Sequence, residues 1–202
     1  MSLAQKLIGA KLCRRFGGEV LSGRIVETEA YLGVIDRAAH SFGGRRTPRT
    51  EPMFREPGTA YVYMTYGMHH CFNVVCGAVD EPVAVLVRAV EPVVGADRMR
   101  AHRSLTATGK PRRRALEDSD LCSGPARLCQ AMRIDRNLTG RDLCVSDDVW
   151  IDLRGSEKRG DLANGTRIGV GYAGSWALKP LRWYEIGSRH VSRRDPSAEV
   201  RA

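Results

Sequence analysis

Three side chains close together in the sequence have the chemistry to hold a planar base and to attack the bond behind it. Glu29 and Tyr31 share one face of a predicted strand, because strand side chains alternate between two faces, and His40 follows shortly after. A carboxylate can activate water as a general base, and aromatic rings can enclose a base. These residue types favour an enzyme that extrudes one nucleotide and acts on its base.

Tyr66 is an aromatic residue at the expected tip of a β-hairpin. Tyr61 and Tyr63 share one face of the preceding strand, whereas Tyr66 has the opposite parity and immediately precedes Gly67. An aromatic side chain at a turn is exposed, and an exposed ring on a basic protein can stack on bases. Tyr66, with Met68 beside it, is therefore a candidate for insertion into DNA.

Arg88 interrupts an otherwise apolar run over residues 83–90. Burying a guanidinium group is unfavourable unless it meets an anion. Either the strand frays and Arg88 reaches solvent, or Arg88 pairs with a carboxylate, for which Glu29 is the natural partner. Such a pair would keep Glu29 ionised, as a general base must be.

Each of these residues, taken alone, also has an ordinary structural interpretation. Glu27 and Glu29 could be solvated carboxylates on an exposed strand. Tyr31 could be a half-buried strand aromatic, and Asn73 could satisfy a neighbouring backbone group. Base chemistry is therefore indicated by the combination and not by any single residue.

Hydrophobic alternation and turn residues indicate which elements would position these side chains. Strands are expected at 11–16, 19–31, 61–66, 69–76, 83–90, 149–153, 167–172 and 181–186, and helices at 3–9, 92–105 and 124–133. An ordered surface loop is expected over 41–58. The order of elements favours one α+β domain: a curved, mostly antiparallel β-sheet core flanked by helices, with a protruding β-hairpin. Without a bulge in 19–31, Ile25 and Glu27 share a face with Glu29.

The charge of the chain favours an anionic partner. Its 202 residues suit a single domain, with about 193–202 expected as a loose tail. Lys and Arg total 32 against 23 acidic residues, a formal charge of +9, so nucleic acid is the first partner to consider. The basic groups are Arg45, Arg46 and Arg49; Arg98, Arg100 and Arg103; Lys110, Arg112, Arg113 and Arg114; and Arg189, Arg193, Arg194 and Arg201. Four such groups are more consistent with a phosphate-facing surface than with solvated loops alone.

No metal and no cofactor are expected. The six cysteines have no C-x-x-C spacing and no histidine at zinc-finger spacing. No secretory signal and no apolar stretch of membrane-spanning length is visible, so no membrane association is expected. We expect an intracellular protein, in the cytoplasm or nucleoid if it is bacterial.

Several motifs together resemble the alkyladenine (3-methyladenine) DNA glycosylase family, in the expected order from about residue 3 to about 192. The strand segment 23–33, GRIVETEAYLG, resembles the hallmark strand of that family. The other segments are 38–41, 47–49 with 53–54, 57–63, 66–68, 87–92, 121–125 and 179–182. The resemblance implies a monomeric, monofunctional enzyme that hydrolyses the N-glycosidic bond of alkylated or deaminated purines in duplex DNA, without a lyase step, and so starts base excision repair.

The resemblance also implies roles for single residues around the scissile bond. Glu29 matches the general base that activates a water molecule, and Arg88 matches the residue that helps to hold this water. The backbone of Ile168 would be a further contact to it. Tyr66 matches the side chain that intercalates in the duplex, with Met68 beside it.

A second group of residues is expected to form the pocket for the extruded base. Tyr31 and His40 match the residues that contact or sandwich the base, and Tyr63 would stack from the other side. Asn73 matches a residue that excludes guanine by meeting its exocyclic amine, and Leu86 belongs to the same expected pocket.

Two other classes of function remain open at this point. A non-catalytic module that binds damaged nucleic acid could use Tyr66 and the basic groups without chemistry, and it would not need Glu29 near Arg88. A protein-interaction domain with incidental charge would show no DNA affinity at modest salt.

Overall fold

Strand β2 (Glu19–Tyr31) is the element around which the sheet is built. The computed structural model describes residues 2–106, 109–112, 114–156 and 159–199. In this part of the chain β2 pairs antiparallel with β1 (Lys11–Phe16), with β5 (Ala84–Val94) and with β8 (Arg182–Glu185). Because β2 is 13 residues long, its two ends can serve different neighbours.

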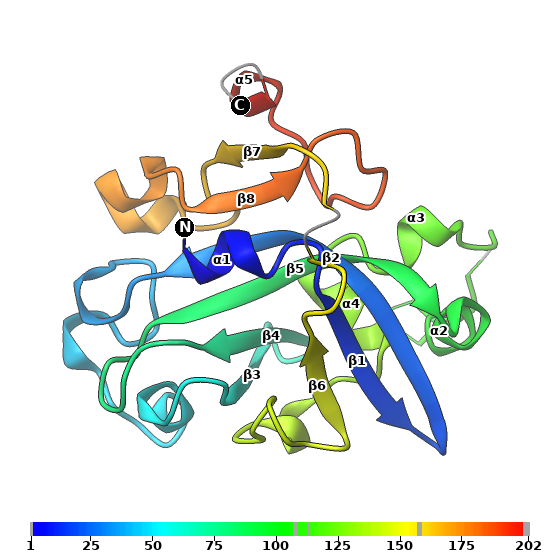
Figure 1. Cartoon of the computed structure of the whole chain (residues 1–202), viewed down its shortest axis with the longest axis horizontal. Helices are drawn as coiled ribbons and strands as arrows, with labels where there is room; N and C mark the ends of the chain where they lie inside the picture. Colours follow the sequence, from blue (N-terminus) through cyan, green and yellow to red (C-terminus); the bar gives the residue numbers. More distant parts are fainter. Residues whose placement is uncertain (1, 107–108, 113, 157–158, 200–202) are drawn as a thin grey trace.

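The remaining described strands extend the sheet. β4 (His69–Val75) pairs with β5 and with β3 (Ala60–Thr65), β6 (Val149–Asp152) pairs with β1, and β7 (Leu162–Gly165) pairs with β8. Every one of these pairings is antiparallel. Figure 1 shows the sheet curling into a half-barrel, with β7 and β8 above the long β2–β5 pair. The expected α+β domain with a curved antiparallel sheet is confirmed.

The first hairpin has the bounds that the sequence predicts. β1 ends at Phe16, which pairs with Glu19 at the start of β2. Gly17 and Gly18 between them have φ angles of 60° and 81°. These left-handed angles suit a tight hairpin turn and cost little only for glycine. The sequence pattern and the backbone geometry therefore agree at this turn.

Short helices pack against the sheet. The structure describes α1 (Leu3–Lys6), α2 (Ala96–His102), α3 (Asp118–Leu121), α4 (Pro125–Ala131) and α5 (Pro196–Glu199). The helix expected at 92–105 is shorter because β5 continues to Val94, and Gly95, at φ 81°, turns the chain into α2. The helix expected at 3–9 ends at Lys6. Among the described residues no helix has the length and apolar character needed to cross a membrane.

Side chains of β3, β4 and β5 alternate between two environments. Val62, Phe72 and Val85, one from each strand, are buried in the main hydrophobic core beneath the helices. The opposite face carries Tyr61 and Tyr63 from β3, Cys71 and Asn73 from β4, and Ala84 and Leu86 from β5, all of which line one cavity. The two-residue period of the strands thus separates the core from the cavity.

A bulge in β2 overturns the strict alternation expected there. Ile25 pairs with Val90 of β5 and Glu27 pairs with Ala89, so Val26 lies between them without a partner on that strand. Because of this extra residue, Ile25 belongs to the main core, whereas Glu27 belongs to the polar side of the sheet. The prediction that Ile25 and Glu27 share a face was wrong for this reason.

A second irregularity lies directly beside the first, on β5. Glu27 pairs with Ala89, but the next residue, Thr28, pairs with Val87, so Arg88 is the extra residue of β5. Bulges bend a strand and redirect a side chain, and they are frequent next to active sites. Arg88 is therefore aimed by a local break in the sheet and not by regular alternation.

The C-terminal third differs most from the sequence prediction. The strand expected at 167–172 is absent; β7 lies earlier in the chain, and residues 171–178 form 3₁₀ turns. Part of the segment 193–202, for which a loose tail is expected, lies within the described residues. Asp195 exchanges hydrogen bonds with the Tyr184 hydroxyl at 2.9 Å, and Ala198 is buried against Tyr184. This packing holds the segment against β8.

Candidate active site

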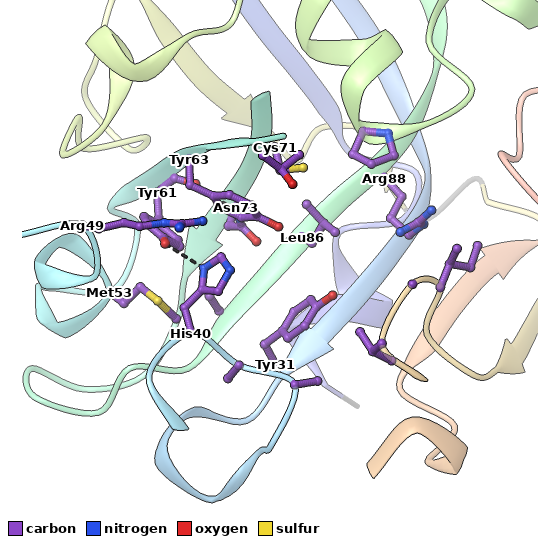
Figure 2. A pocket seen from close by; sticks show the side chains of 18 of the residues that line it. Tyr31, His40, Arg49, Met53, Tyr61, Tyr63, Cys71, Asn73, Leu86 and Arg88 are labelled. Atoms are coloured by element: carbon purple, nitrogen blue, oxygen red, sulfur yellow. Dashed lines mark hydrogen bonds between the residues drawn. The ribbon is translucent and has the colours of Figure 1, made fainter. Parts of the chain in front are cut away.

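A cavity of about 330 Å³ opens on the polar face of β3, β4 and β5. It is lined by Tyr31, Ala38, Ala39, His40, Arg49, Met53, Tyr61, Tyr63, Thr65, Tyr66, Cys71, Asn73, Ala84, Leu86, Arg88, Pro125, Ile168, Gly169, Val170 and Tyr172. Figure 2 shows Tyr31 on one side of this space and His40, Tyr61 and Tyr63 on the other. Aromatic side chains facing each other across a space of this size suit a flat ligand.

Glu29 is fully buried beside this cavity and accepts hydrogen bonds from three donors. The Ile168 amide donates to Oε1 at 2.7 Å, and the Tyr31 hydroxyl donates to Oε2 at 2.9 Å. Arg88 Nη1 lies 3.1 Å from Oε1. A carboxylate has about four acceptor positions, so one remains for a further donor such as water. All three partners line the cavity, which places this acceptor next to its wall.

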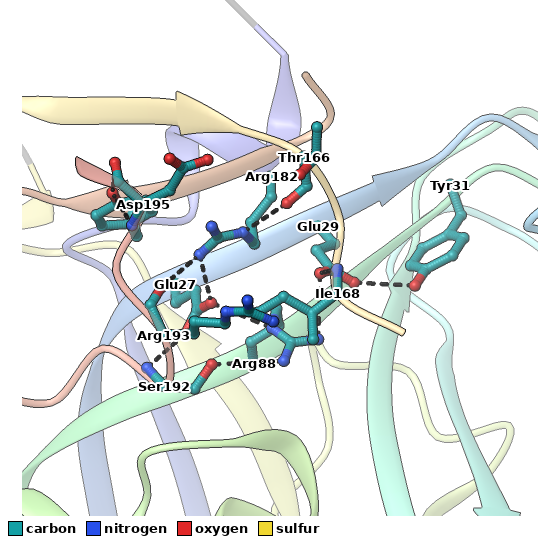
Figure 3. A network of polar contacts seen from close by, with 11 residues as sticks. Glu27, Glu29, Tyr31, Arg88, Thr166, Ile168, Arg182, Ser192, Arg193 and Asp195 are labelled. Carbon is teal, nitrogen blue, oxygen red and sulfur yellow. Dashed lines mark hydrogen bonds and ion pairs between the residues drawn. The ribbon is translucent and has the colours of Figure 1, made fainter. Parts of the chain in front are cut away.

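Glu27 holds Arg88 from the other side. Its Oε1 lies 3.1 Å from Arg88 Nε and also 3.1 Å from Arg182 Nη1, and its Oε2 accepts the Ser192 amide at 2.8 Å. Figure 3 shows this network between Glu29 and the C-terminal segment. Two carboxylates and two guanidinium groups are buried together, so their formal charges cancel.

Tyr31 is fixed on both its edge and its face. Burial and the neighbouring Glu29 carboxylate raise the pKa of Tyr31 well above 10, so its hydroxyl stays protonated and donates. Arg167 lies over the ring at 4.8 Å from the centroid, and it is itself paired with Asp36 at 2.5 Å. Asp36 also accepts the amides of Leu32 and Ala38, which follow the end of β2. The ring therefore has little freedom to turn.

His40 forms the facing wall together with two tyrosines. Its Nδ1 lies 2.9 Å from the Tyr61 hydroxyl, and its ring meets the Tyr63 ring edge-on, with centroids 4.5 Å apart. Burial, with Arg49 and Arg45 nearby, lowers the pKa of His40 to about 4. At neutral pH the imidazole is therefore uncharged. It can contact a base, but it is not an imidazolium that donates a proton.

One row of paired residues crosses the sheet beneath the cavity. Tyr61 pairs with Asn73, Asn73 with Leu86, and Leu86 with Glu29. Paired residues point to the same side of a sheet, so the row carries an aromatic ring, an amide, an apolar side chain and a carboxylate in order. The Asn73 side-chain amide donates to the Tyr61 carbonyl at 3.0 Å, which fixes its orientation.

Tyr66 is at the tip of the β3–β4 hairpin, as the sequence predicts. Its side chain is 87% exposed, and that of Met68 is 57% exposed. Tyr66 has φ 51° and Gly67 has φ 69°, and the Met68 amide donates to the Thr65 carbonyl at 3.3 Å. A left-handed angle is unfavourable for a tyrosine and is more often found where function requires it. The turn therefore presents the ring to solvent at a cost in backbone energy.

The structure brings the expected site residues together around one cavity. Tyr31, His40, Tyr63, Asn73, Leu86, Arg88, Ile168 and Tyr66 line it, Glu29 is bonded to three of them, and Met68 is in the same turn as Tyr66. The expected ion pair between Arg88 and Glu29 is present, so Arg88 does not simply reach solvent. The solvated interpretation of Glu27 and Glu29 is excluded, because both are fully buried.

Sequence reasoning missed four residues that support this site. Glu27 and Arg182 balance the charge around Arg88, and Asp36 and Arg167 fix Tyr31. Glu27 had a signal, since it precedes Glu29 on the same strand. Arg182 lies in the segment 179–182 that resembles the family, but its pairing with Glu27 could not be read from that segment. Arg167 is distant from Tyr31 in the chain, and nothing in its neighbourhood indicated its role.

The four basic groups do not form one simple surface. Arg49 lines the cavity, Arg46 pairs with Glu51 and Asp80, and Arg103 is buried. Arg113 and Arg201 lie outside the described residues. The charge next to the cavity therefore comes chiefly from the loop before β3.

Comparison with known proteins gives consistent results along the chain. The family model described as methylpurine-DNA glycosylase matches residues 1–189. The chain is 48% identical over 201 residues to a DNA-3-methyladenine glycosylase of Homo sapiens and 46% identical over 202 residues to that of Mus musculus. It is 39% identical over 197 residues to a putative 3-methyladenine DNA glycosylase of Clostridium botulinum.

The matches cover these proteins to different extents. Each mammalian alignment covers 98% of this chain, but 66% of the human protein and 60% of the mouse protein. The clostridial alignment covers 96% of this chain and 94% of its relative. With the family model matching almost from end to end, the chain belongs to the methylpurine-DNA glycosylase family.

Proposed function

We propose that this protein is a monofunctional DNA glycosylase that removes alkylated or deaminated purines from duplex DNA and so starts base excision repair. The observation that carries the proposal is the buried Glu29 carboxylate, oriented by three donors that themselves line a cavity with aromatic walls. Family membership and the names of the relatives support the same activity. We expect the protein to act as a monomer without metal or cofactor.

The proposed reaction is a hydrolysis in which Glu29 acts as the general base. A water molecule at the remaining acceptor position of the carboxylate transfers a proton to Glu29 while its oxygen bonds to the anomeric carbon. The bond from that carbon to the purine breaks, and its electron pair leaves with the base. The products are the free base and an abasic deoxyribose. A cationic alkylated purine leaves as a neutral molecule, whereas hypoxanthine must gain a proton.

The cavity would bind the extruded base, and the hairpin would hold the duplex open. Tyr31 on one side and His40 with Tyr63 on the other would enclose it, and stacking contributes about 1–3 kcal/mol per base. Tyr66 would fill the vacated position in the duplex and slow the return of the base. Unstacking costs a few kcal/mol and is easiest for a damaged base, which favours lesions over intact pairs.

Asn73 and Leu86 would form the inner surface against which a purine edge is read. The Asn73 amide is held by the Tyr61 carbonyl, so it cannot turn freely to accommodate a different base. A guanine would bring its exocyclic amine against this fixed group, and an unsatisfied polar contact in a buried site is costly. We infer that Asn73 excludes normal guanine.

The test uses end-labelled duplexes that carry one hypoxanthine or one ethenoadenine. After incubation with the protein, hot alkali cleaves any abasic site, and fragment length locates it. Cleavage only after alkali treatment would support a glycosylase without lyase activity. Tight binding to both duplexes with no release of any base, 3-methyladenine included, would instead favour a damage-binding module on the same fold.

A further inference from the structure

Both aromatic walls of the cavity have a guanidinium group against them, but only one of these groups is neutralised. Arg167 lies over Tyr31 at 4.8 Å and pairs with Asp36 at 2.5 Å. Arg49 lies over Tyr63 at 5.4 Å from the ring centroid. Among the described residues no carboxylate comes within ion-pair distance of Arg49. The two walls are therefore alike in geometry and different in charge.

The buried charges around Glu29 cancel. Arg88 and Arg182 are balanced by Glu27 and Glu29. His40 is neutral at pH 7, since burial and the nearby arginines lower its pKa to about 4. Arg49 is thus left as the unbalanced charge among the described residues that line the cavity. Figure 2 shows it beside Tyr61 and Tyr63, on the side of the cavity where His40 lies.

We propose that Arg49 is a specificity-determining residue that biases the cavity toward neutral damaged bases and against cationic ones. The inference rests on the proposed function. A positive charge beside the cavity repels a base that carries its own positive charge, as purines methylated on a ring nitrogen do. A base such as hypoxanthine escapes this repulsion and can accept a hydrogen bond from a guanidinium nitrogen.

The position of Arg49 over Tyr63 also disfavours a cationic base, by a second effect. A tyrosine face attracts a cation through its ring quadrupole. Because Arg49 already lies over this ring, the ring attracts a cationic base on its other face less strongly. A neutral base stacks by dispersion and loses little from this arrangement.

The neighbouring arginines provide a matched control. Arg46 is neutralised by Glu51 and Asp80, so its removal would also disturb those carboxylates. Arg45 is exposed, lies in the same loop and does not line the cavity. Arg45→Gln therefore removes the same charge from the same loop while every side chain that lines the cavity is kept. Arg49→Lys keeps the charge and changes the shape.

The experiment compares two rates of base release under single-turnover conditions with saturating protein. One substrate is a duplex with a single deoxyinosine, which releases neutral hypoxanthine. The other is methylated duplex DNA, which releases 3-methyladenine from a cationic nucleotide. Neither base has the 2-amino group that Asn73 would oppose. The measured quantity is the ratio of the hypoxanthine rate to the 3-methyladenine rate, relative to that ratio for the wild type, so that the intrinsic lability of each bond cancels.

We expect Arg49→Gln to lower this ratio by about three- to tenfold, the size expected for one partly screened charge. The ratio for Arg49→Lys should stay within about twofold of the wild-type ratio. The ratio for Arg45→Gln should do so too, even if this substitution slows both reactions. Equal loss of both rates in Arg49→Gln would overturn the proposal and identify a phosphate contact instead. If Arg49→Lys lowered the ratio as much as Arg49→Gln, the proposed role of charge would be overturned.

Failure of the proposed function has a different signature. A wild-type protein that releases neither base would refute the glycosylase proposal, and the selectivity proposal with it. A wild-type protein that releases both, with a ratio that Arg49→Gln leaves unchanged, would refute only the role of Arg49. Because Arg49 is exposed, its variants are expected to fold, and thermal melting by circular dichroism verifies this.

Discussion

Glu29 is an ionisable group whose three polar partners are all hydrogen-bond donors. The Tyr31 hydroxyl, the Ile168 amide and the Arg88 guanidinium point at its two oxygens. A neutral amide at this position would have to direct its own N–H groups toward these donors. The three donors therefore favour a carboxylate over an amide at this position. The isosteric substitution Glu29→Gln tests the role of that carboxylate.

We expect Glu29→Gln to lower base release by at least about 10²-fold, the usual contribution of a general base. Binding to a lesion duplex should survive, because Glu29 does not line the cavity. Gel-shift affinity and single-turnover cleavage measure the two properties. Glu19→Gln, an exposed carboxylate on the same strand, is the control and should leave both unchanged. Near-normal activity of Glu29→Gln would show that another group activates the water.

His40 gives a pH dependence of stability. Its pKa is lowered to about 4 in the folded protein, so between about pH 4 and 6.5 the unfolded chain binds the proton first. His40 therefore contributes fully above about pH 6.5, and its contribution is lost as the pH falls toward 4, on the order of 2 kcal/mol after screening. Urea denaturation of wild type and His40→Gln should show a shallower decline in the variant over this range. Parallel declines would contradict the assignment.

At the scale of elements, the site depends on departures from regular structure. A bulge at Val26 and the extra residue Arg88 bring Glu27 and Arg88 together, and the left-handed Tyr66 exposes a ring at the hairpin tip. Each departure lowers the stability of the fold, and it persists because the regular strands around it are stable enough to hold it. Stability and activity are thus expected to respond in opposite directions at the hairpin tip.

Tyr66→Asn tests this opposition, because asparagine tolerates left-handed angles. We expect unfolding free energy to be unchanged or raised by up to about 1 kcal/mol, while base release falls by about tenfold or more as stacking is lost. Gly67→Ala, which adds strain at φ 69°, should lower stability by about 1 kcal/mol. Urea denaturation and cleavage assays on both variants measure the effects. Normal cleavage by Tyr66→Asn would show that Tyr66 does not intercalate.

Glu27→Gln tests the buried network. Removing one carboxylate leaves Arg88 and Arg182 with less negative charge, and breaking a buried ion pair costs about 3–5 kcal/mol. Glu91→Gln is the matched control on the same sheet, since Glu91 pairs with Arg24 near the surface and should contribute less than about 1 kcal/mol. Equal effects of the two substitutions on urea unfolding would mean that the buried network adds no special stability.

The sequence predicted those elements whose signals are local. The β1–β2 hairpin has the expected bounds because Gly17 and Gly18 mark its turn, and the cavity side of β3 follows from alternation at Tyr61 and Tyr63. The bulge at Val26 carries no local signal, since it depends on pairing with β5.

The C-terminal third was harder for the same reason. The run 167–172 is rich in strand-forming residues, but it contributes an amide to Glu29 instead of a strand. Tertiary contacts outweighed local preference there. The prediction that Ile168 belongs to the site came from the resemblance of motifs and not from hydrophobic pattern, and its contact to a water molecule stays a prediction.

For the whole molecule, the formal charge of +9 is a long-range property that single contacts do not capture. Such an excess attracts a polyanion from a distance and supplies affinity without sequence preference. The distribution of that charge, unlike its sum, is set by the fold: Arg46 and Arg154 form ion pairs with neighbouring carboxylates, whereas Arg45 is exposed.

We expect affinity for undamaged duplex to fall linearly with the logarithm of salt concentration. Arg45→Gln should reduce the slope by about one, because one phosphate contact is lost. Arg154→Gln should leave it unchanged, since Arg154 already pairs with Asp152. Fluorescence anisotropy at several salt concentrations measures the slopes. The Arg45 prediction fails if its slope equals that of wild type.

The partners of Glu27 are synthesised at very different times. Its carboxylate is satisfied by Arg88 and by Ser192, which is 165 residues farther along the chain. At about 5–20 residues per second, a ribosome needs roughly 10–30 s to make that stretch. Until then the Glu27 carboxylate lacks Arg182 and Ser192, two of its three partners. In refolding, amides of β2 and β8 should gain protection together, which pulse-labelled hydrogen exchange can resolve.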